Sequence, residues 1–208
     1  MKKLLLMTAL AVFGLTTTNA QEVRLGAKAG ANFASIGGDE TDDLDGRTSF
    51  HIGGLVEIPI SEVFSVQPEL LYSSQGAKIE ESFEGGTIES KTKLDYINVP
   101  IMAKFYVADG FSIEAGPQVG FLVSANAETE FSGDFGDIEI EGDGEDDISD
   151  FVSGIDLGIG AGASYRLTNG VFFGARYVLG LSNINDGEGA DDFKQQNNVI
   201  QLSAGYSF

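Results

Sequence analysis

The chain of 208 residues contains no cysteine, no tryptophan, four prolines and a single histidine, His51. The missing thiols exclude disulfide bonds, thiolate metal sites and a lipid-modified cysteine. The sequence also has no phosphate-binding loop, dinucleotide fingerprint or zinc motif. Basic residues are few, and the net charge of −20 makes nucleic acid an unfavourable partner. These absences leave few routes to catalysis, and we expect no enzyme activity and no cofactor.

Long hydrophobic runs are missing as well. No stretch reaches the roughly 20 apolar residues that a membrane-spanning helix needs. The apolar run at 4–15 follows two lysines, and Thr18 and Ala20 occupy the positions that a signal peptidase reads. We therefore predict a signal peptide at 1–20 and an exported β-barrel domain at 21–208.

What the chain has instead is alternation. Apolar residues recur at every second position, the period of a strand with one apolar face. Twenty-eight glycines and fifteen phenylalanines fit many short strands better than helices. The pattern predicts eight strands, at 23–34, 49–59, 64–74, 94–107, 111–124, 151–167, 171–181 and in the segment that ends at 208.

The final strand carries the clearest alternation and ends in an aromatic residue. Small or polar residues separate the members of its apolar face, which suits a wall between lipid and a polar lumen. We expect this face to act as the assembly signal that the barrel-insertion machinery recognises. Its members are Ile200, Leu202, Ala204, Tyr206 and Phe208.

Short and long connections alternate strictly between these strands. The connections at 60–63, 108–110 and 168–170 are tight, whereas those at 35–48, 76–93, 125–150 and 183–197 are long and polar. This rhythm is typical of an all-β, eight-stranded antiparallel up-and-down transmembrane barrel, with short periplasmic turns and long acidic extracellular loops. Aromatic residues fall near both ends of the strands, as two membrane-interface girdles require.

The face opposite the apolar one carries charge. Four cations and four anions are expected to point into the lumen and to balance there, because unpaired buried charges are costly. A soluble lipocalin-like barrel is the alternative. Its apolar face would point inward around a ligand, and these charges would lie on the outside. The predicted lumen network comprises Arg24, Lys28, Glu57, Glu69, Lys104, Glu114, Asp156 and Arg176.

The order of segments resembles a known family. HIGGLVEIPI, FSVQPELLYSSQGAK, LDYINVPIMAKFYV, FSIEAGPQVGFLVSA, GARYVLGLSNIND and QLSAGYSF are similar to blocks of the small outer-membrane β-barrels of Bacteroidota, labelled porin-family or PorT-like. Their architecture is similar to that of OmpA and OmpX. The resemblance covers essentially the whole mature chain, and it implies the fold and a Gram-negative outer-membrane location but no activity.

The four long connections hold 24 of the 32 acidic residues, and the third, 125–150, has eleven with no cation. Such oxygen clusters suit weak calcium binding or bridging to lipopolysaccharide phosphates, although their spacing matches no EF-hand loop. We expect contacts with outer-membrane lipid and lipopolysaccharide, an unidentified surface partner, and a monomer. The weak calcium candidates are Asp143, Glu145, Asp146 and Asp147.

Three functions remain open. The first is a structural or surface-interaction role, with the lumen plugged by paired charges. The second is a narrow porin or channel for small solutes or ions that uses the same lumen residues. The third is an outer-membrane enzyme built around His51, with Ser49 or Asp150 nearby, although no spacing fixes such a constellation.

Overall fold

The computed structural model describes residues 23–39, 41, 44–83, 86–134, 139–187, 190 and 193–208. The expected signal peptide and the start of the mature chain lie outside this part. Within it, no helix is long and apolar enough to span a membrane. The elements are β1 (Arg24–Gly38), β2 (Asp45–Pro59), β3 (Phe64–Phe83), β4 (Gly86–Ala108), β5 (Phe111–Asp134), β6 (Glu139–Asp147), the 3-10 helix η1 (Ser149–Phe151), β7 (Ile155–Arg166), β8 (Val171–Gly180) and β9 (Gln195–Ser207).

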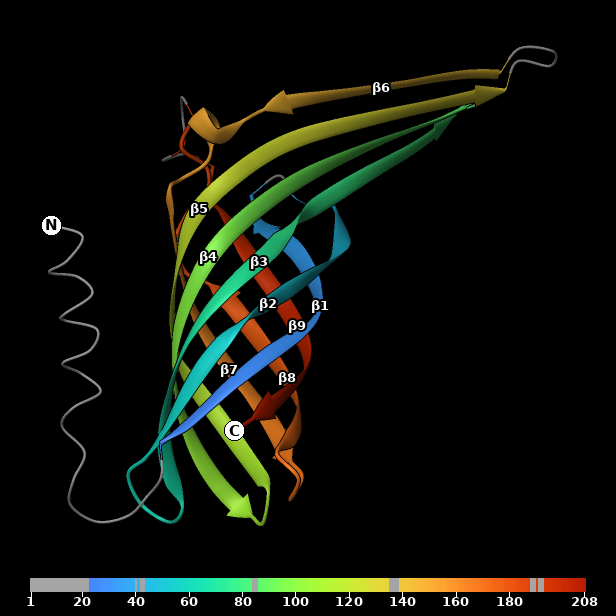
Figure 1. Cartoon of the computed structure of the whole chain (residues 1–208). Helices are drawn as coiled ribbons and strands as arrows, with labels where there is room; N and C mark the ends of the chain where they lie inside the picture. The colour runs from blue at the N-terminus through green and yellow to red at the C-terminus, as the bar shows by residue number, and fades with distance from the viewer. Residues whose placement is uncertain are drawn as a thin grey trace, which may run out of the picture.

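Eight of these strands close into a ring, as the alternation predicts. Every neighbour is antiparallel, in the order β4-β3-β2-β1-β9-β8-β7-β5, and the pairing of β4 with β5 completes the circle. Closure leaves the wall without open edges, which a strand in lipid could not tolerate. The up-and-down barrel is therefore confirmed (Figure 1).

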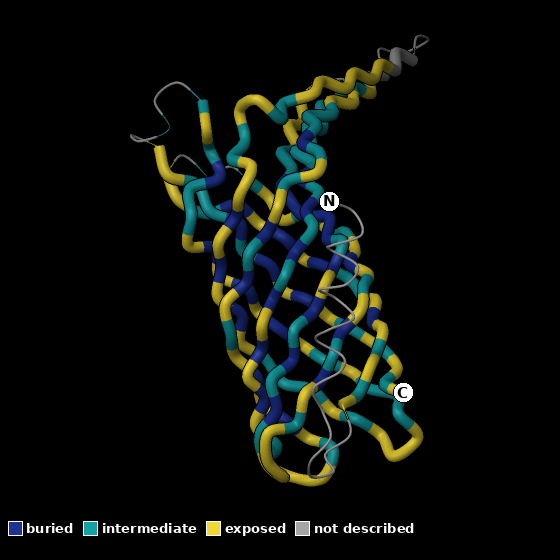
Figure 2. Tube along the Cα trace, turned by 60° about the vertical axis from the view of Figure 1, so that its left-hand side comes forward, coloured by how far each residue is buried: buried dark blue, intermediate teal, exposed yellow. Residues whose placement is uncertain are grey.

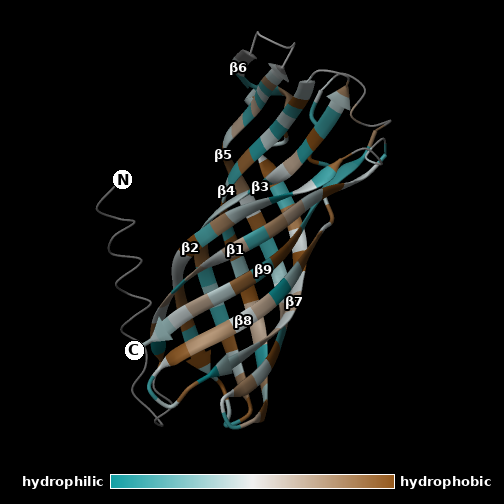
Figure 3. Ribbon diagram, turned by 90° about the vertical axis from the view of Figure 1, so that its right-hand side faces the viewer, coloured by the Kyte–Doolittle hydropathy of each residue, from teal (hydrophilic) through white to brown (hydrophobic). Residues whose placement is uncertain are grey.

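The wall alternates between exposed and buried positions along each strand. Large apolar side chains such as Ile52, Leu70, Ile101 and Leu157 are about half exposed on the outside, while polar residues are buried inside. Figure 2 shows this as a lattice of buried and exposed positions, and Figure 3 shows hydrophobic residues along the wall strands. An apolar outside and a polar inside is the reverse of a soluble barrel, because lipid is the solvent.

Two of the short turns take the predicted hairpin form. Gly110, after Asp109, has φ 75°, and Gly170, after Asn169, has φ 90°. This left-handed region is open to glycine at little cost. The aromatic residues near these turns also align across strands, since Phe111 faces Tyr165 and Tyr165 faces Phe173.

Two predicted loops are strands instead. The segments 76–93 and 125–150 were expected to be long polar loops, but β3, β4 and β5 continue far beyond the wall, and β6 pairs with the outer half of β5. Residues 76–83, 86–93, 125–134 and 139–147 thus form a four-stranded outer sheet at the long-loop end (Figure 1). Continued hydrogen bonding across the strands satisfies the backbone groups that a loop would leave to water.

The two faces of the outer sheet differ in character. Rows of paired residues place Lys78, Lys91, Glu128 and Glu145 on one face. The other face carries Ile79, Phe83, Ile88 and Phe131, and the Phe83 and Phe131 rings stack with centroids 6.1 Å apart. The sheet therefore has one charged face and one partly apolar face.

Candidate functional site

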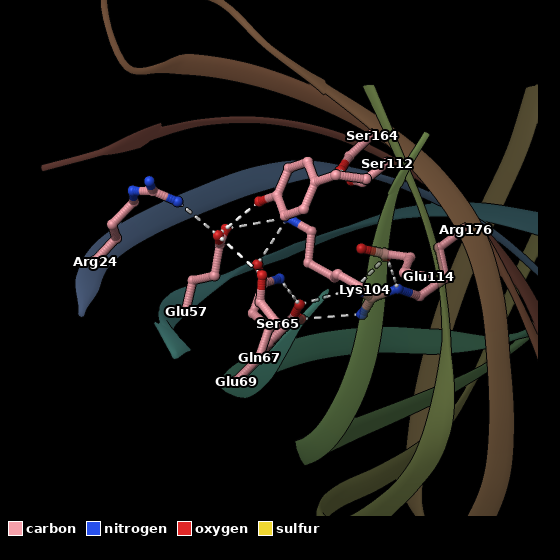
Figure 4. Close-up of polar contacts among 11 residues, drawn as sticks. Arg24, Glu57, Ser65, Gln67, Glu69, Lys104, Ser112, Glu114, Ser164 and Arg176 are labelled. Carbon is pink, nitrogen blue, oxygen red and sulfur yellow. Dashed lines mark hydrogen bonds and ion pairs between the residues drawn. The ribbon is translucent and has the colours of Figure 1, made fainter. Parts of the chain in front are cut away.

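One charged part of the barrel interior is an inner cluster of four side chains, from β1, β3, β5 and β8. The Arg176 guanidinium donates two hydrogen bonds to Glu69, of 2.8 and 3.0 Å, and a 2.6 Å bond to Glu114. Lys28 Nζ lies 2.6 Å from Glu69 Oε2, and the Glu69 side chain is fully buried. Two cations thus meet two carboxylates, with the bidentate geometry that makes arginine pairs strong. Figure 4 shows Arg176 with Glu69 and Glu114.

A second group, the rim cluster, lies toward the short-turn end and is centred on Glu57. This carboxylate accepts hydrogen bonds from Arg24 at 2.9 Å, Lys104 at 3.3 Å and the Tyr106 hydroxyl at 2.6 Å (Figure 4). Arg166 lines the same cavity as Glu57 and Lys104, and we count it in the cluster. Two of the three cations in this cluster therefore contact Glu57, and Arg166 lines the cavity beside them.

Asp156 stands apart from both clusters, which corrects the expected balance of four against four. It is buried as predicted, but it accepts hydrogen bonds from Ser182 at 2.9 Å and Asn197 at 3.3 Å. Among the described residues it makes no ion pair. Gly162 of β7 pairs with Arg176. Asp156 lies six residues before Gly162 on the same strand, which separates the two positions by about 20 Å at strand spacing. The alternation along a strand predicts the face on which a residue lies, but not its position along the barrel axis.

His51 belongs to a polar layer beyond the inner cluster. The Asn32 amide nitrogen lies 3.0 and 2.7 Å from the carbonyl oxygens of Phe50 and Ser74, which can only accept, so Asn32 Oδ1 must be the acceptor for His51 Nδ1 at 2.8 Å. His51 Nε2 lies 2.9 Å from Ser203 Oγ, a hydroxyl that can donate or accept. The imidazole is thus held by hydrogen bonds on both ring nitrogens, with a proton on Nδ1.

The partners considered for His51 from the sequence are wrong. Ser49 donates its hydroxyl proton to the Ser74 carbonyl at 2.6 Å, and Asp150 is exposed in η1. Its actual neighbours are Ser203 and Asn32. Ser203, His51 and Asn32 follow one another as the nucleophile, base and orienting group of a catalytic triad do. However, the His51 ring is fully buried, and the cavity that reaches Ser203 has a volume of only about 30 Å³ for the centres of water molecules. That is room for about two waters, not for an acyl substrate.

Apolar side chains gather at the long-loop end of the lumen, and we call them the apolar cap. Tyr96, Leu94, Ile36 and Ile184 are buried together there with two alanines, and Leu122 packs against them. The Asn197 amide reaches the Tyr96 hydroxyl at 3.4 Å. An apolar layer without charged groups offers an ion no substitute for its water shell. The sequence did not predict this cap, although inward parity at Leu94 and Tyr96 could have indicated it.

The calcium candidates do not converge on one site. Asp143, Glu145 and Asp147 share the charged face of β6, whereas Asp146 points to the other face. Within the described residues, no group of three or more acidic or histidine side chains could hold a metal ion. Glu145 instead lies directly across from Glu128, a like-charge pair.

Cations for this acidic segment come from the neighbouring strand. Lys93 forms an ion pair with Glu128, and Lys91 Nζ lies 3.0 Å from Glu130. The hydrogen bond from Lys93 lowers the pKa of Glu128, and the hydrogen bond to Glu130 raises the pKa of Lys91. Neither pairing could be read from a loop considered alone.

The terminal apolar face lies outside, as its pattern requires. Ile200, Leu202, Ala204 and Tyr206 are exposed on the wall, and Phe208 is 78% exposed with its ring edge-on to Tyr206 at 5.2 Å. The Phe208 amide donates to the Leu25 carbonyl at 2.7 Å, which ties the last residue to β1. The recognition role of this face remains a prediction.

Known proteins agree with this architecture. The Ail attachment invasion locus protein of Yersinia pestis matches 90% of this chain and 100% of its own, with a TM-score of 0.50 at 16% identity. Neisserial surface protein A matches 92% of this chain and 100% of its own, with a TM-score of 0.50 at 14% identity. No curated protein sequence matches.

At these identities the two structures show the shared fold alone. The family model for the outer membrane protein beta-barrel domain matches residues 19–186, which is most of the chain. Its family and the closed lipid-facing ring place this protein in the outer membrane of a Gram-negative bacterium. The chain belongs to the outer membrane protein beta-barrel domain family.

Proposed function

We propose that this protein is a non-conducting outer-membrane barrel that presents the outer sheet as a surface-contact element. The observation that carries the proposal is the outer sheet itself, in which β3, β4 and β5 continue beyond the lipid-facing wall and β6 is added beside β5 (Figure 1). Elements that extend beyond a rigid scaffold are where binding functions concentrate. No catalytic step is part of the proposal.

The lumen supports a plug in preference to a channel. An ion crossing it would have to pass the rim cluster, the inner cluster, the hydrogen-bonded layer around His51 and the apolar cap. An eight-stranded barrel is only wide enough to be filled by its own side chains. The narrow channel therefore has no continuous polar path in its favour.

The outer sheet is suited to a cationic, extended protein segment. Among the residues that the structure describes, β6 pairs with β5 along one side only, so its other edge offers backbone donors and acceptors to a partner. Asp143, Glu145 and Asp147 follow that edge. A second copy of β6 would bring like charges together, whereas lysine or arginine side chains would complement them.

The test replaces the outer sheet by two short turns, each placed between two residues that face each other on neighbouring strands. Lys78 faces Lys91 and Asn126 faces Asp147, so 79–90 and 127–146 can each be replaced by an Asn-Gly hairpin turn. We expect this short-sheet variant to fold, with normal heat-modifiable gel mobility, and to lose calorimetric binding of an alternating lysine–valine peptide.

A variant with Asp143→Asn, Glu145→Gln and Asp147→Asn is the matched control, because it keeps the length of the sheet. It should bind the peptide more weakly than the wild type does. Equal binding by wild-type and short-sheet proteins, or failure of the short-sheet variant to fold, would remove the outer sheet as the contact element.

A further inference from the structure

A small cavity lies inside the short-turn end of the barrel, the end that faces the periplasm in barrels of this kind. Its lining includes Lys104, Arg166, Ser112 and Ser164, and Gly110 of a short turn lines its outer side. The cavity has about 30 Å³ for the centres of water molecules, enough for about two waters or one small ion. It extends from the rim cluster to Lys28, Glu114 and Arg176 of the inner cluster, and it is separate from the outer sheet.

The charges around this cavity do not balance. Its lining carries four cations, Lys28, Lys104, Arg166 and Arg176, against two carboxylates, Glu57 and Glu114. Glu69 and Arg24 do not line the cavity but pair with groups that do, and counting them too leaves five cations against three carboxylates, a surplus of two. A positive surplus inside a chain of net charge −20 is a local feature, and uncompensated charge in a barrel interior is costly.

Hydrogen-bond donors also remain free there. Within the described residues, Arg166 makes no ion pair and no side-chain hydrogen bond, so its guanidinium donors are unused by the protein. The Ser112 and Ser164 hydroxyls lie 2.9 Å apart. One of them donates to the other, which leaves the second proton free to point into the cavity.

We propose that the rim cavity binds a small tetrahedral oxyanion of the phosphate class. Arg166 supplies the charge-assisted donors, Lys104 a second positive charge, and the serine pair a neutral donor. Both carboxylates of the lining are already paired, Glu57 with Arg24, Lys104 and Tyr106, and Glu114 with Arg176. Their charges are therefore largely compensated before the anion enters. The ligand is either free phosphate or the phosphate group of a lipid headgroup, since both present the same oxygens.

Calorimetry on the full barrel in maltoside micelles, which contain no phosphate, tests the proposal with inorganic phosphate as the probe. We expect saturable binding by the wild type and at least about tenfold weaker binding by Arg166→Gln. Lys194→Gln is the matched control, because it removes the same charge from an exposed site at the long-loop end and should bind as the wild type does. Lys104→Gln should also weaken binding, because Lys104 lines the cavity, and it keeps the test decisive if Arg166→Gln does not fold.

A second titration with glycerol phosphate separates the two sources. Binding of glycerol phosphate as tight as that of inorganic phosphate supports a headgroup ligand, and binding of inorganic phosphate alone supports the free ion. The proposal is overturned by the absence of saturable heat in the wild type. It is also overturned if the folded rim variants bind as well as the wild type, or if Lys194→Gln loses as much affinity as they do.

Discussion

At the scale of single residues, Arg176 makes more of the interior contacts than any other cation described here. Its guanidinium contacts both carboxylates of the inner cluster, and the side chain is buried. Removing it would leave Glu69 with Lys28 as its one cation and Glu114 with none in the ion pairs described. A buried carboxylate left without a partner is far more costly than an exposed one.

We therefore expect Arg176→Ala to lower the free energy of unfolding by about 3–5 kcal/mol. Urea unfolding in detergent micelles measures the change. It is followed by far-ultraviolet circular dichroism, because the chain has no tryptophan for a fluorescence measurement. Arg24→Ala is the control, because that side chain is one-third exposed and its pair with Glu57 should be worth at most about 1 kcal/mol. Equal losses in the two variants would contradict the assignment of Arg176 to a dry, structural cluster.

The faces of these residues were predictable from the sequence, but their partners were not. Strand parity placed seven of the eight network residues in buried positions, with Arg24 only partly buried. The separation of Asp156 from the cations depends on register and on strand tilt, which alternation does not encode. The same limit explains why Asn32 and Ser203 were not linked to His51, since they lie on three strands far apart in sequence.

At the scale of elements, the outer sheet is the part that sequence reasoning read least well. Ile79 and Phe83 alternate with Lys78, Glu80 and Ser82, which is a strand pattern, but the dense charge favoured a solvated loop. Cross-strand pairs between Lys93 and Glu128 stabilise the register once the strands meet. The short turns were read correctly because their signal is local.

The Lys93–Glu128 pair gives the outer sheet a pH dependence. The pKa of Glu128 lies below its ordinary value of 4.5, chiefly because Lys93 donates a hydrogen bond to it. A lowered pKa in the folded state means that the pair stabilises the sheet above the unfolded value and that this contribution is lost as the pH falls through the folded value. Acid also relieves the repulsion between Glu128 and Glu145. The contribution of the Lys93–Glu128 pair is therefore measured as the difference between the wild type and a variant that lacks Lys93.

We expect Lys93→Met to reduce hydrogen-exchange protection of β4 and β5 in the outer sheet at neutral pH. The difference between wild type and variant should vanish below the folded pKa of Glu128, while the wall strands stay protected in both. A difference that persists unchanged in acid would show that Lys93 acts through packing and not through its ion pair with Glu128.

The last strand carries a prediction about assembly. Phe208 is the most exposed large apolar side chain described, and it closes the alternating face of β9. Phe208→Ser should slow insertion and leave more protein in the periplasm, where proteases remove it. Phe172→Ser, an aromatic change within β8, is the comparison variant. Normal membrane yield of Phe208→Ser would count against a terminal recognition signal.

At the scale of the whole molecule, two parts have separate physical roles. The barrel wall faces lipid outside and encloses four successive layers, from the rim cluster to the apolar cap. The outer sheet lies beyond the wall and carries most of its charge on one face. The ring and its location followed from alternation and loop rhythm, whereas the filling of the lumen required the structure.

Single-channel recording in a planar lipid bilayer tests the closed lumen most directly. Wild-type protein that has inserted, as verified by its heat-modifiable mobility, should give no steady conductance above the bare bilayer, because we propose that the inner cluster and the cap block the axis. Steady ohmic channels whose ion selectivity changes with Arg176→Ala or Glu69→Gln would contradict the plugged barrel and favour the narrow channel.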